Sequence, residues 1–122
     1  DLVEYWKYNR FPPPTKEVLP NNAKGGMMVV DEFGNNICAG FLYETNSSLA
    51  WCEFIVASPL IKDRKIRKEG QVFLIKSLCD KARKKGYLAV FASIKHDALI
   101  ERYIEAGFSV DDKKSTELII RL

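Results

Sequence analysis

The spacing of apolar residues predicts an antiparallel meander in the first half of the chain. Three β-rich runs occupy residues 27–33, 37–45 and 49–58, and read MMVVDEF, ICAGFLYET and LAWCEFIVAS. The short polar stretches GNN and NSS separate these runs. Because such stretches join antiparallel strands, the three runs are expected to pair in sequence order.

Beyond Pro59 the apolar residues recur every three or four positions, which is typical of an α-helix. The apolar stripe of residues 63–86 consists of Phe73, Leu74, Leu78 and Ala82. This segment is predicted to form one long amphipathic helix. Its last turn is basic, which suits the negative end of a helix dipole, and Gly86 is placed to end it.

The last third of the chain predicts two further strands and a second helix. Residues 87–94, YLAVFASI, form an almost continuously apolar run, which is typical of a strand buried on both faces. Residues 98–106 predict a helix, with Asp97 as its cap. FSV at residues 108–110 and STELIIRL at residues 115–122 flank a DDKK turn and predict a final hairpin.

The order of these elements predicts an α/β (α+β) fold in a single domain over residues 1–122. Residues 1–10 are compatible with a short helix, and residues 11–26 are a Pro-rich connection. The core, residues 27–122, runs β-β-β-α-β-α-β. We therefore expect a mixed sheet in which an antiparallel meander precedes a β-α-β crossover, with helices on both faces.

Composition and charge predict a soluble protein whose second half binds an anion. The chain is 47% hydrophobic and 29% charged, and no apolar run reaches the ~18 residues of a membrane span. We expect a soluble protein without a membrane partner. The net charge is +3, but residues 1–61 carry four Lys/Arg against seven Asp/Glu, and residues 62–122 carry fifteen against nine. An anion is therefore expected to bind the second half.

The cysteines and the single histidine exclude a metal site. Cys38, Cys52 and Cys79 are odd in number and lie in apolar runs, which indicates buried free thiols in a reducing, cytoplasmic compartment. No CxxC motif or Cys/His cluster could hold a metal ion. A net charge of +3 without a recognisable nucleic-acid-binding motif argues against a nucleic-acid partner.

The stretch HDALIERYIEAGF, residues 96–108, carries a motif match. The pattern is Asn-x-x-Ala-x-x-x-Tyr-x-x-x-Gly-Phe, with one position of slack at Ala. It is matched by His96 in place of Asn, Ala98 or Leu99, Tyr103, Gly107 and Phe108. With the element order, this resembles the GNAT acyltransferase superfamily, which transfers acetyl or related groups from acyl-coenzyme A to amines. The resemblance covers residues 27–122, and the compact meander looks most like small GNAT-fold proteins of tailed phages, which act in the host cytoplasm.

The resemblance implies a catalytic role for Tyr103. In the family this phenol protonates the thiolate of the departing coenzyme A, which is general-acid catalysis. The alternative is that Tyr103 packs its ring in the core and leaves its hydroxyl in water.

The family binds the cofactor's pyrophosphate at a glycine-rich loop, which this chain lacks. The pattern Arg/Gln-x-x-Gly-x-Gly/Ala is expected after the third strand, where residues 58–73 contain Gly70 as their only glycine. The segment instead carries five cations at the expected helix start: Lys62, Arg64, Lys65, Arg67 and Lys68. These cations and Gly70 are the candidate phosphate-binding residues. His96, at the Asn position of the motif, is a further candidate cofactor-binding residue. Alternatively, the cations form a solvated face and Gly70 is an ordinary helix-interior glycine.

The third predicted strand carries the remaining candidate site residues. The resemblance implies that the backbone of Ile55, Val56 and Ala57 pairs with the pantetheine arm of the cofactor, although these residues also suit a core strand. Glu53 precedes them. It is either the base that deprotonates the acceptor amine or a residue on an edge or solvent face.

The sequence as a whole predicts an acetyl-coenzyme A-dependent N-acyltransferase. The amine acceptor would be a small molecule or a protein, and Tyr103 and Glu53 would be the catalytic pair. The alternative is a GNAT-fold module without catalysis that binds a protein or nucleic-acid partner. The missing glycines favour the alternative, and the Tyr103 motif favours the enzyme.

Overall fold

The computed structural model describes residues 18–23, 25–111, 113, 115–120 and 122, together with Leu2 and Glu4. Apart from those two residues, the predicted helix at residues 1–10 lies outside this set, as does most of the Pro-rich connection. No described helix is long and apolar enough to cross a membrane.

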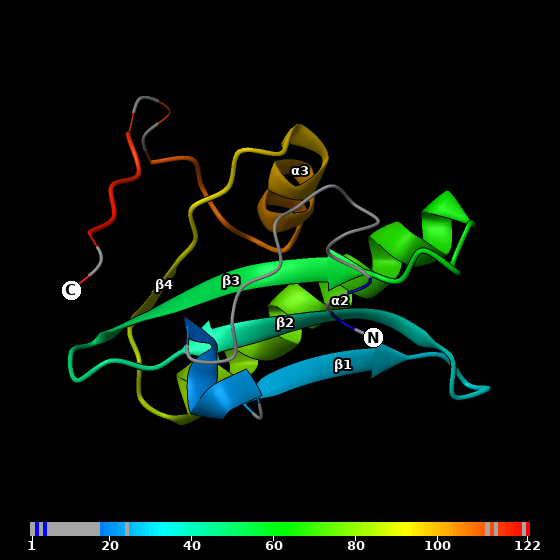
Figure 1. Cartoon of the computed structure of the whole chain (residues 1–122), viewed down its shortest axis with the longest axis horizontal. Helices are drawn as coiled ribbons and strands as arrows, with labels where there is room; N and C mark the ends of the chain where they lie inside the picture. The colour runs from blue at the N-terminus through cyan, green and yellow to red at the C-terminus, as the bar shows by residue number, and fades with distance from the viewer. Residues whose placement is uncertain are drawn as a thin grey trace.

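A four-stranded mixed sheet forms the centre of the molecule (Figure 1). Its strands are β1 (Gly26–Val30), β2 (Asn36–Tyr43), β3 (Leu49–Ala57) and β4 (Ala89–Phe91). They lie in sequence order, with β1–β2 and β2–β3 antiparallel and β3–β4 parallel. The predicted meander is therefore confirmed, and so is the mixed sheet.

Polar side chains build both turns of the meander. At the first turn, the Asp31 carboxylate accepts hydrogen bonds from the backbone N–H groups of Phe33 and Asn35, at 2.8 and 2.9 Å. At the second, the Thr45 hydroxyl contacts the carbonyl of Leu49 and accepts from the N–H of Ser47. Short polar side chains satisfy backbone groups that a tight turn leaves unpaired. Here Asp31 and Thr45, which precede GNN and NSS in the sequence, do so.

Two α-helices follow the meander: α2 (Arg64–Lys84) and α3 (Asp97–Glu105). The long amphipathic helix is confirmed. Its cap is Asp63, and Gly86 follows it with a φ of 91°. The predicted cap of the second helix is wrong by one residue, because His96 takes the N-cap position and Asp97 lies in the first turn, where a negative charge suits the helix dipole.

The sheet has apolar residues on both faces. One face packs against α2 and contributes most of the larger core. The members of this core include Cys38, Leu42, Cys52, Ile55, Leu74, Ile75, Leu78 and Tyr103. The opposite face carries a smaller cluster of Leu19, Ala39, Phe41 and Val56, beside the 3₁₀-helix η2 (Pro20–Ala23), which lies in front of the sheet in Figure 1. Helical segments thus lie on both faces of the sheet.

A bulge changes the direction in which the side chains of β3 point. Phe54 has a φ of 57°, and the pairing of β2 with β3 shifts between Ala39 and Phe41. Before the bulge Cys52 faces α2, whereas after it Ile55 and Ala57 do. One extra residue in a strand reverses the alternation beyond it, so both Cys52 and Ile55 reach the same core.

Two predicted strands differ from the structure. The strand predicted at residues 87–94 is confined to β4, and it is not buried on both faces, because Leu88 is 85% and Phe91 44% exposed. The predicted final hairpin is absent from the described residues 108–111 and 115–120. Since no strand of the described chain covers the outer side of β4, its apolar residues remain at an edge.

Candidate functional site

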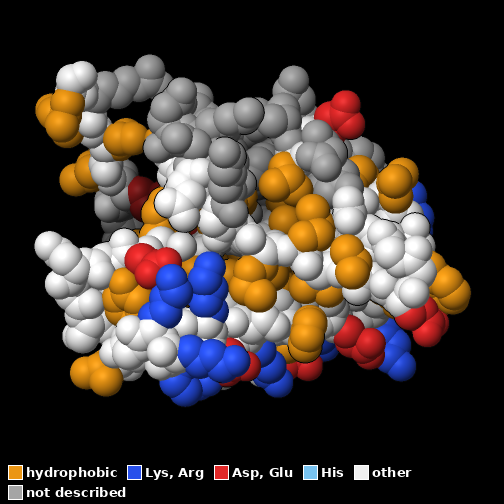
Figure 2. All heavy atoms as spheres, turned by 90° about the horizontal axis from the view of Figure 1, so that it is seen from below, with side chains coloured by type: hydrophobic (Ala, Val, Ile, Leu, Met, Phe, Trp, Pro, Cys, Tyr) orange, Lys and Arg blue, Asp and Glu red, His pale blue; other side chains and the backbone are white. Residues whose placement is uncertain are grey.

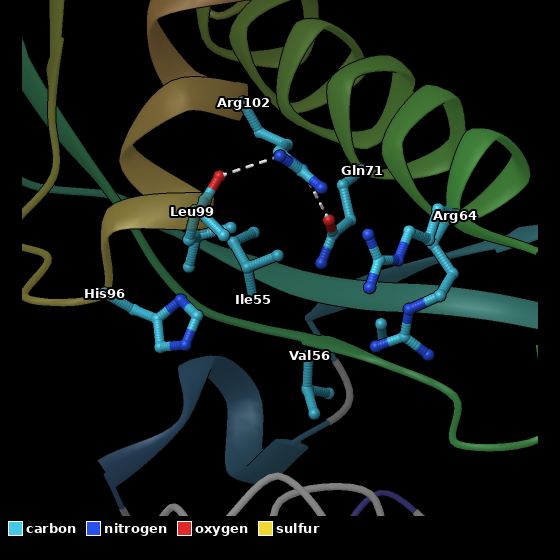
Figure 3. Close-up of a pocket in the computed structure, with 10 residues that line it drawn as sticks. Ile55, Val56, Arg64, Gln71, His96, Leu99 and Arg102 are labelled. Atoms are coloured by element: carbon cyan, nitrogen blue, oxygen red, sulfur yellow. Dashed lines mark hydrogen bonds between the residues drawn. The ribbon is translucent and has the colours of Figure 1, made fainter. Parts of the chain in front are cut away.

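A cavity of about 400 Å³ lies where β3, α2 and α3 meet. Its walls are formed by residues from all three elements and from the residue before α3: Ile55, Val56, Ala57, Arg64, Arg67, Gln71, His96, Ala98, Leu99 and Arg102. Figure 3 shows the α2 residues and the α3 residues reaching toward one another from opposite sides, with Ile55 and Val56 between them.

The divergence of two parallel strands opens this cavity. β3 pairs with β4 only as far as Trp51 and Phe91, and the chain then leaves β3. The backbone of Ile55–Ala57 consequently has no strand beside it on the β4 side. Backbone N–H and C=O groups at such a position need hydrogen-bond partners, and an extended ligand can provide them.

One face of α2 supplies the basic wall of the cavity. Arg64, Arg67 and Gln71 are spaced by three and four residues, so they project from the same side of the helix. Arg67 donates two hydrogen bonds through Nη1, to the carbonyl oxygens of Ser58 at 2.7 Å and Ile61 at 3.0 Å. These bonds fix the loop between β3 and α2.

α3 supplies the opposite wall. Arg102 donates from Nε to Oε1 of Gln71 at 3.2 Å and from Nη1 to the carbonyl of Ala98 at 3.1 Å (Figure 3). The first bond joins the two helices across the cavity. His96 and Leu99 lie on the same wall.

The predicted cofactor-binding residues divide into two groups. Those that line the cavity are Ile55, Val56, Ala57, Arg64, Arg67 and His96. Those outside its lining are Lys62, Lys65, Lys68 and Gly70. Lys65 lies 4.0 Å from Glu69, and Lys68 lies 3.3 Å from Glu105, so both lysines form ion pairs.

Gly70 is a packing residue. It is buried in α2, and a Cβ atom at this position would lie 2.6 Å from Cγ2 of Ile37. The glycine therefore allows α2 to approach β2 closely. The structure supports the alternative of a helix-interior glycine and gives Gly70 no contact with the cavity.

Tyr103 lies in the core and is absent from the cavity lining. Its hydroxyl donates to the carbonyl oxygen of Cys52 at 3.3 Å and lies 3.5 Å from the Cys52 Sγ. Its ring packs edge-on against Phe108, with the ring centroids 5.0 Å apart. Burial raises the pKa of Tyr103 far above its ordinary value, so the phenol keeps its proton.

Glu53 lies at the point where β3 and β4 diverge. Its Oε1 accepts hydrogen bonds from the backbone N–H of Ser93 at 2.5 Å and from Nε1 of Trp51 at 2.8 Å. Burial raises the pKa of Glu53, and these two hydrogen bonds oppose the rise because they favour the carboxylate. Glu53 is thus a half-buried, hydrogen-bonded carboxyl group rather than a residue on a solvent face.

Four residues of the cavity were not among the predicted site residues: Gln71, Ala98, Leu99 and Arg102. Their spacing contained a signal. Ala98 and Leu99 follow His96 closely, and Arg102 lies three residues after Leu99 on the same helix face.

A second hollow, of about 480 Å³, lies between β1 and the end of α2. Its lining is basic and consists of Met27, Ser77, Asp80, Lys81, Lys84 and Lys85. Figure 2 shows the Lys and Arg side chains of this region gathered on the surface. Cations at a helix C-terminus are favoured by the dipole alone, and Lys85 already binds Glu44 at 2.8 Å. The first cavity is therefore the better candidate.

The described residues form no candidate metal-binding site. They contain no group of three or more His, Cys, Asp or Glu side chains that could hold an ion. Cys38 and Cys52 are buried free thiols, as predicted, and burial raises the pKa of each to about 12. Thiols with such pKa values remain protonated and unreactive. Cys79 is also a free thiol, but it is only partly buried, contrary to the prediction.

Comparison with known proteins identifies similar folds among solved structures. No protein-family profile matches the sequence, and no curated protein does. Among solved structures, an aminoglycoside acetyltransferase from an uncultured soil metagenomic sample, in complex with sisomicin, is similar at a TM-score of 0.63 and 15% identity, over 99% of this chain and 86% of that one.

Two further acetyltransferases show the same similarity. Glucosamine-6-phosphate N-acetyltransferase from Arabidopsis thaliana aligns at a TM-score of 0.62 and 11% identity, over 97% of this chain and 88% of that one. A Trypanosoma brucei acetyltransferase aligns at a TM-score of 0.57 and 18% identity, over 96% and 89%. Identities this low establish the architecture alone. The chain has the fold of the GNAT acetyltransferases.

Proposed function

We propose that this protein is an N-acyltransferase that uses an acyl-coenzyme A, with acetyl-coenzyme A as the first candidate, and an amine acceptor. The thioester supplies an activated carbonyl carbon. In the reaction the amine nitrogen bonds to that carbon, the carbon–sulfur bond breaks, the nitrogen loses a proton and the sulfur gains one.

One observation carries this proposal. A single cavity is lined both by Ile55–Ala57, where β3 continues beyond its pairing with β4, and by a wall that contains Arg64, Arg67 and Arg102. The first feature suits the amide groups of a pantetheine arm, and the second suits phosphate groups. A molecule with both features in series, such as coenzyme A, therefore fits the residues present.

Two protonatable groups lie beside the point of divergence, on opposite faces of the sheet. Glu53 pairs with Phe41 on the η2 face, whereas Cys52, which holds the Tyr103 hydroxyl, faces α2. The proposed roles follow from their chemistry. Glu53 accepts the proton of the amine, and Tyr103 transfers its own proton to the sulfur. Neither side chain is part of the cavity lining.

A second candidate function is a binding module without catalysis. It is favoured by the position of the Tyr103 hydroxyl, which is bonded to Cys52 and absent from the cavity lining. In this alternative the cavity binds an anionic partner, and no group transfer follows.

Calorimetry with acetyl-coenzyme A tests the proposal directly. We expect saturable binding, followed by acetylation of at least one member of a panel of amines detected by mass spectrometry. Mass detection is preferable to thiol reagents because Cys79 is a partly exposed free thiol. The absence of binding at millimolar ligand would reject the enzyme. Binding without turnover of any amine would favour the module.

A further inference from the structure

We propose that the anion-binding end of the cavity is a clamp of arginine side chains from two helices, formed by Arg64 and Arg67 of α2 and Arg102 of α3. The backbone N–H groups of Lys65 and Ile66 at the start of α2 take no part in it. That the three arginines bind an anion does not depend on the proposed function. The inference rests on that function only where it identifies the anion as the phosphate groups of the acyl donor.

The start of α2 is already occupied by an anion from the protein itself. Oδ1 of Asp63 accepts hydrogen bonds from the N–H groups of Lys65 at 2.9 Å and Ile66 at 3.2 Å. These are the groups with which a helix N-terminus ordinarily binds phosphate. The Asp63 carboxylate satisfies them, and its charge repels a second anion at that point.

The cavity meets the tip of α2 only at Arg64, the first residue of the helix. Its other contacts with α2 are Arg67 and Gln71 on the same side of the helix, and its lining includes none of Asp63, Lys65 and Ile66. An anion between the two helices therefore meets arginine side chains rather than the N–H groups that Asp63 already binds.

Arg102 is held in place for such a contact. Its side chain is 19% exposed, and Gln71 and the Ala98 carbonyl each accept one of its N–H groups. A guanidinium has five N–H donors, so about three remain for a ligand. Because the group is already oriented, it loses little conformational freedom on binding.

Arg67 and Arg64 complete the clamp in different ways. Arg67 is fixed through Nη1 to the loop carbonyls of Ser58 and Ile61. Arg64 is exposed, and the described part of the chain offers its guanidinium no hydrogen-bond or ion-pair partner. It is free to close on a ligand. The lining contains three arginines and no acidic residue. Outside the lining, the exposed carboxylate of Glu101 lies 3.8 Å from Nη1 of Arg102 and compensates part of its charge, so the positive charge left for an anion comes mainly from Arg64 and Arg67.

Inorganic pyrophosphate is the probe for the clamp, with binding measured by calorimetry and by the NMR signals of the arginine Nε–H groups. Arg64→Gln and Arg102→Gln are each expected to weaken binding about tenfold. Arg102→Lys should weaken it as well, because it keeps the charge and loses the planar fork. Arg83→Gln is the matched control. Arg83 pairs with Asp80 on the exposed side of α2, and its replacement should change nothing.

Folding is checked separately, by circular dichroism and chemical unfolding of each variant. Because the Arg64 side chain is exposed, Arg64→Gln should leave the fold intact. This variant therefore tests the clamp even if Arg102→Gln disturbs the contact between α2 and α3. Two results would contradict the proposed clamp. In the first, the wild-type protein does not bind pyrophosphate at millimolar concentration. In the second, Arg64→Gln and Arg102→Gln both bind pyrophosphate as tightly as the wild type does.

Coenzyme A, measured beside pyrophosphate, separates this inference from the proposed function. If pyrophosphate binding depends on the arginines and coenzyme A does not bind, the clamp stands and the acyltransferase proposal fails. If coenzyme A binds and the arginine variants bind it as well as wild type does, the proposed function stands and the clamp is wrong.

Discussion

Cys52 and Glu53 are neighbours on β3 whose side chains lie on opposite faces of the sheet. Cys52 lies in the core against α2 and holds the Tyr103 hydroxyl, whereas the Glu53 carboxylate binds the N–H of Ser93 after β4. Burial raises the pKa of both Tyr103 and Glu53. One candidate proton carrier, Glu53, therefore belongs to β3, and the other, Tyr103 of α3, is hydrogen-bonded to the neighbouring residue Cys52. A substitution of each residue can test the two roles separately.

Tyr103→Phe is expected to lower both stability and turnover. It removes the hydroxyl that binds the buried carbonyl of Cys52, which should cost about 1 kcal/mol in the free energy of unfolding. If the phenol is the proton donor, kcat also falls about 100-fold with little change in KM. Tyr87→Phe is the control, because the Tyr87 hydroxyl binds Thr45 away from the cavity. An unchanged kcat would exclude the catalytic role.

Glu53→Gln is expected to reduce turnover and to change how stability depends on pH. Because the pKa of Glu53 is higher in the folded chain than in the unfolded chain, the group contributes most to stability below its unfolded pKa. That contribution is lost as the pH rises through the folded pKa. Glutamine keeps an oxygen that can accept from Ser93 and Trp51 and does not titrate.

Chemical unfolding at about pH 4 and about pH 7 measures this effect. Relative to wild type, the glutamine variant should gain stability between the two values. Glu44→Gln removes an exposed carboxylate that pairs with Lys85 and serves as the control for a change of charge. Equal pH dependence of wild type and Glu53→Gln would contradict the raised pKa.

At the scale of elements, the close contact of α2 with β2 decides the role of Gly70. Gly70→Ala would favour the isolated helix by about 1 kcal/mol. In the folded chain the new methyl would meet Ile37, so we expect a net loss of about 1–3 kcal/mol in denaturant unfolding. Lys76→Ala, on the exposed side of the same helix, should stay within about 0.5 kcal/mol of wild type. A stabilised Gly70→Ala variant would show that this contact is loose.

The C-terminal segment is the element for which pattern and structure differ most. The sequence predicts a strand at residues 115–122, yet Leu118, Ile119 and Ile120 are between 79% and 91% exposed. The Ser93 hydroxyl donates a hydrogen bond to the Glu117 carboxylate. The C-terminal segment therefore lies beside the residues that follow β4.

Ile119→Lys tests whether the segment packs against the sheet. Because the side chain is exposed, the free energy of unfolding should change by less than about 0.5 kcal/mol. Val56→Lys, at a buried position on β3, provides the contrasting case and should be strongly destabilising. A loss above about 2 kcal/mol for Ile119→Lys would mean that the segment is buried as a strand.

At the scale of the whole molecule, ligand binding joins elements that are far apart in sequence. The cavity draws on β3, α2 and α3, whereas the β1–β2 hairpin lies away from it. Coenzyme A at about 100 times its Kd should raise the unfolding free energy by about 2.7 kcal/mol. Hydrogen exchange should slow at α3 and at residues 58–63, with little change in the turn at residues 31–35. Uniform protection across the chain would contradict binding at this cavity.

Periodicity by itself predicted most of the elements. The three meander strands and α2 were predicted because their signals are local: β-rich runs, the polar turns between them, and an apolar stripe repeated every three or four residues. The extent of β4 was not recovered. The apolar run at residues 87–94 could not reveal that pairing with β3 ends at Phe91, because that end depends on a distant strand.

For the candidate site, the sequence by itself determined the cationic segment, the missing glycines and the residues on β3. Only the tertiary structure decided which cations meet at one cavity. Lys65 and Lys68 form ion pairs with Glu69 and Glu105, whereas Arg64 and Arg67 face Arg102 across the cavity. The physical reason is that composition and spacing fix the side of a helix on which a charge lies, whereas the packing of two helices against a sheet fixes what that charge faces.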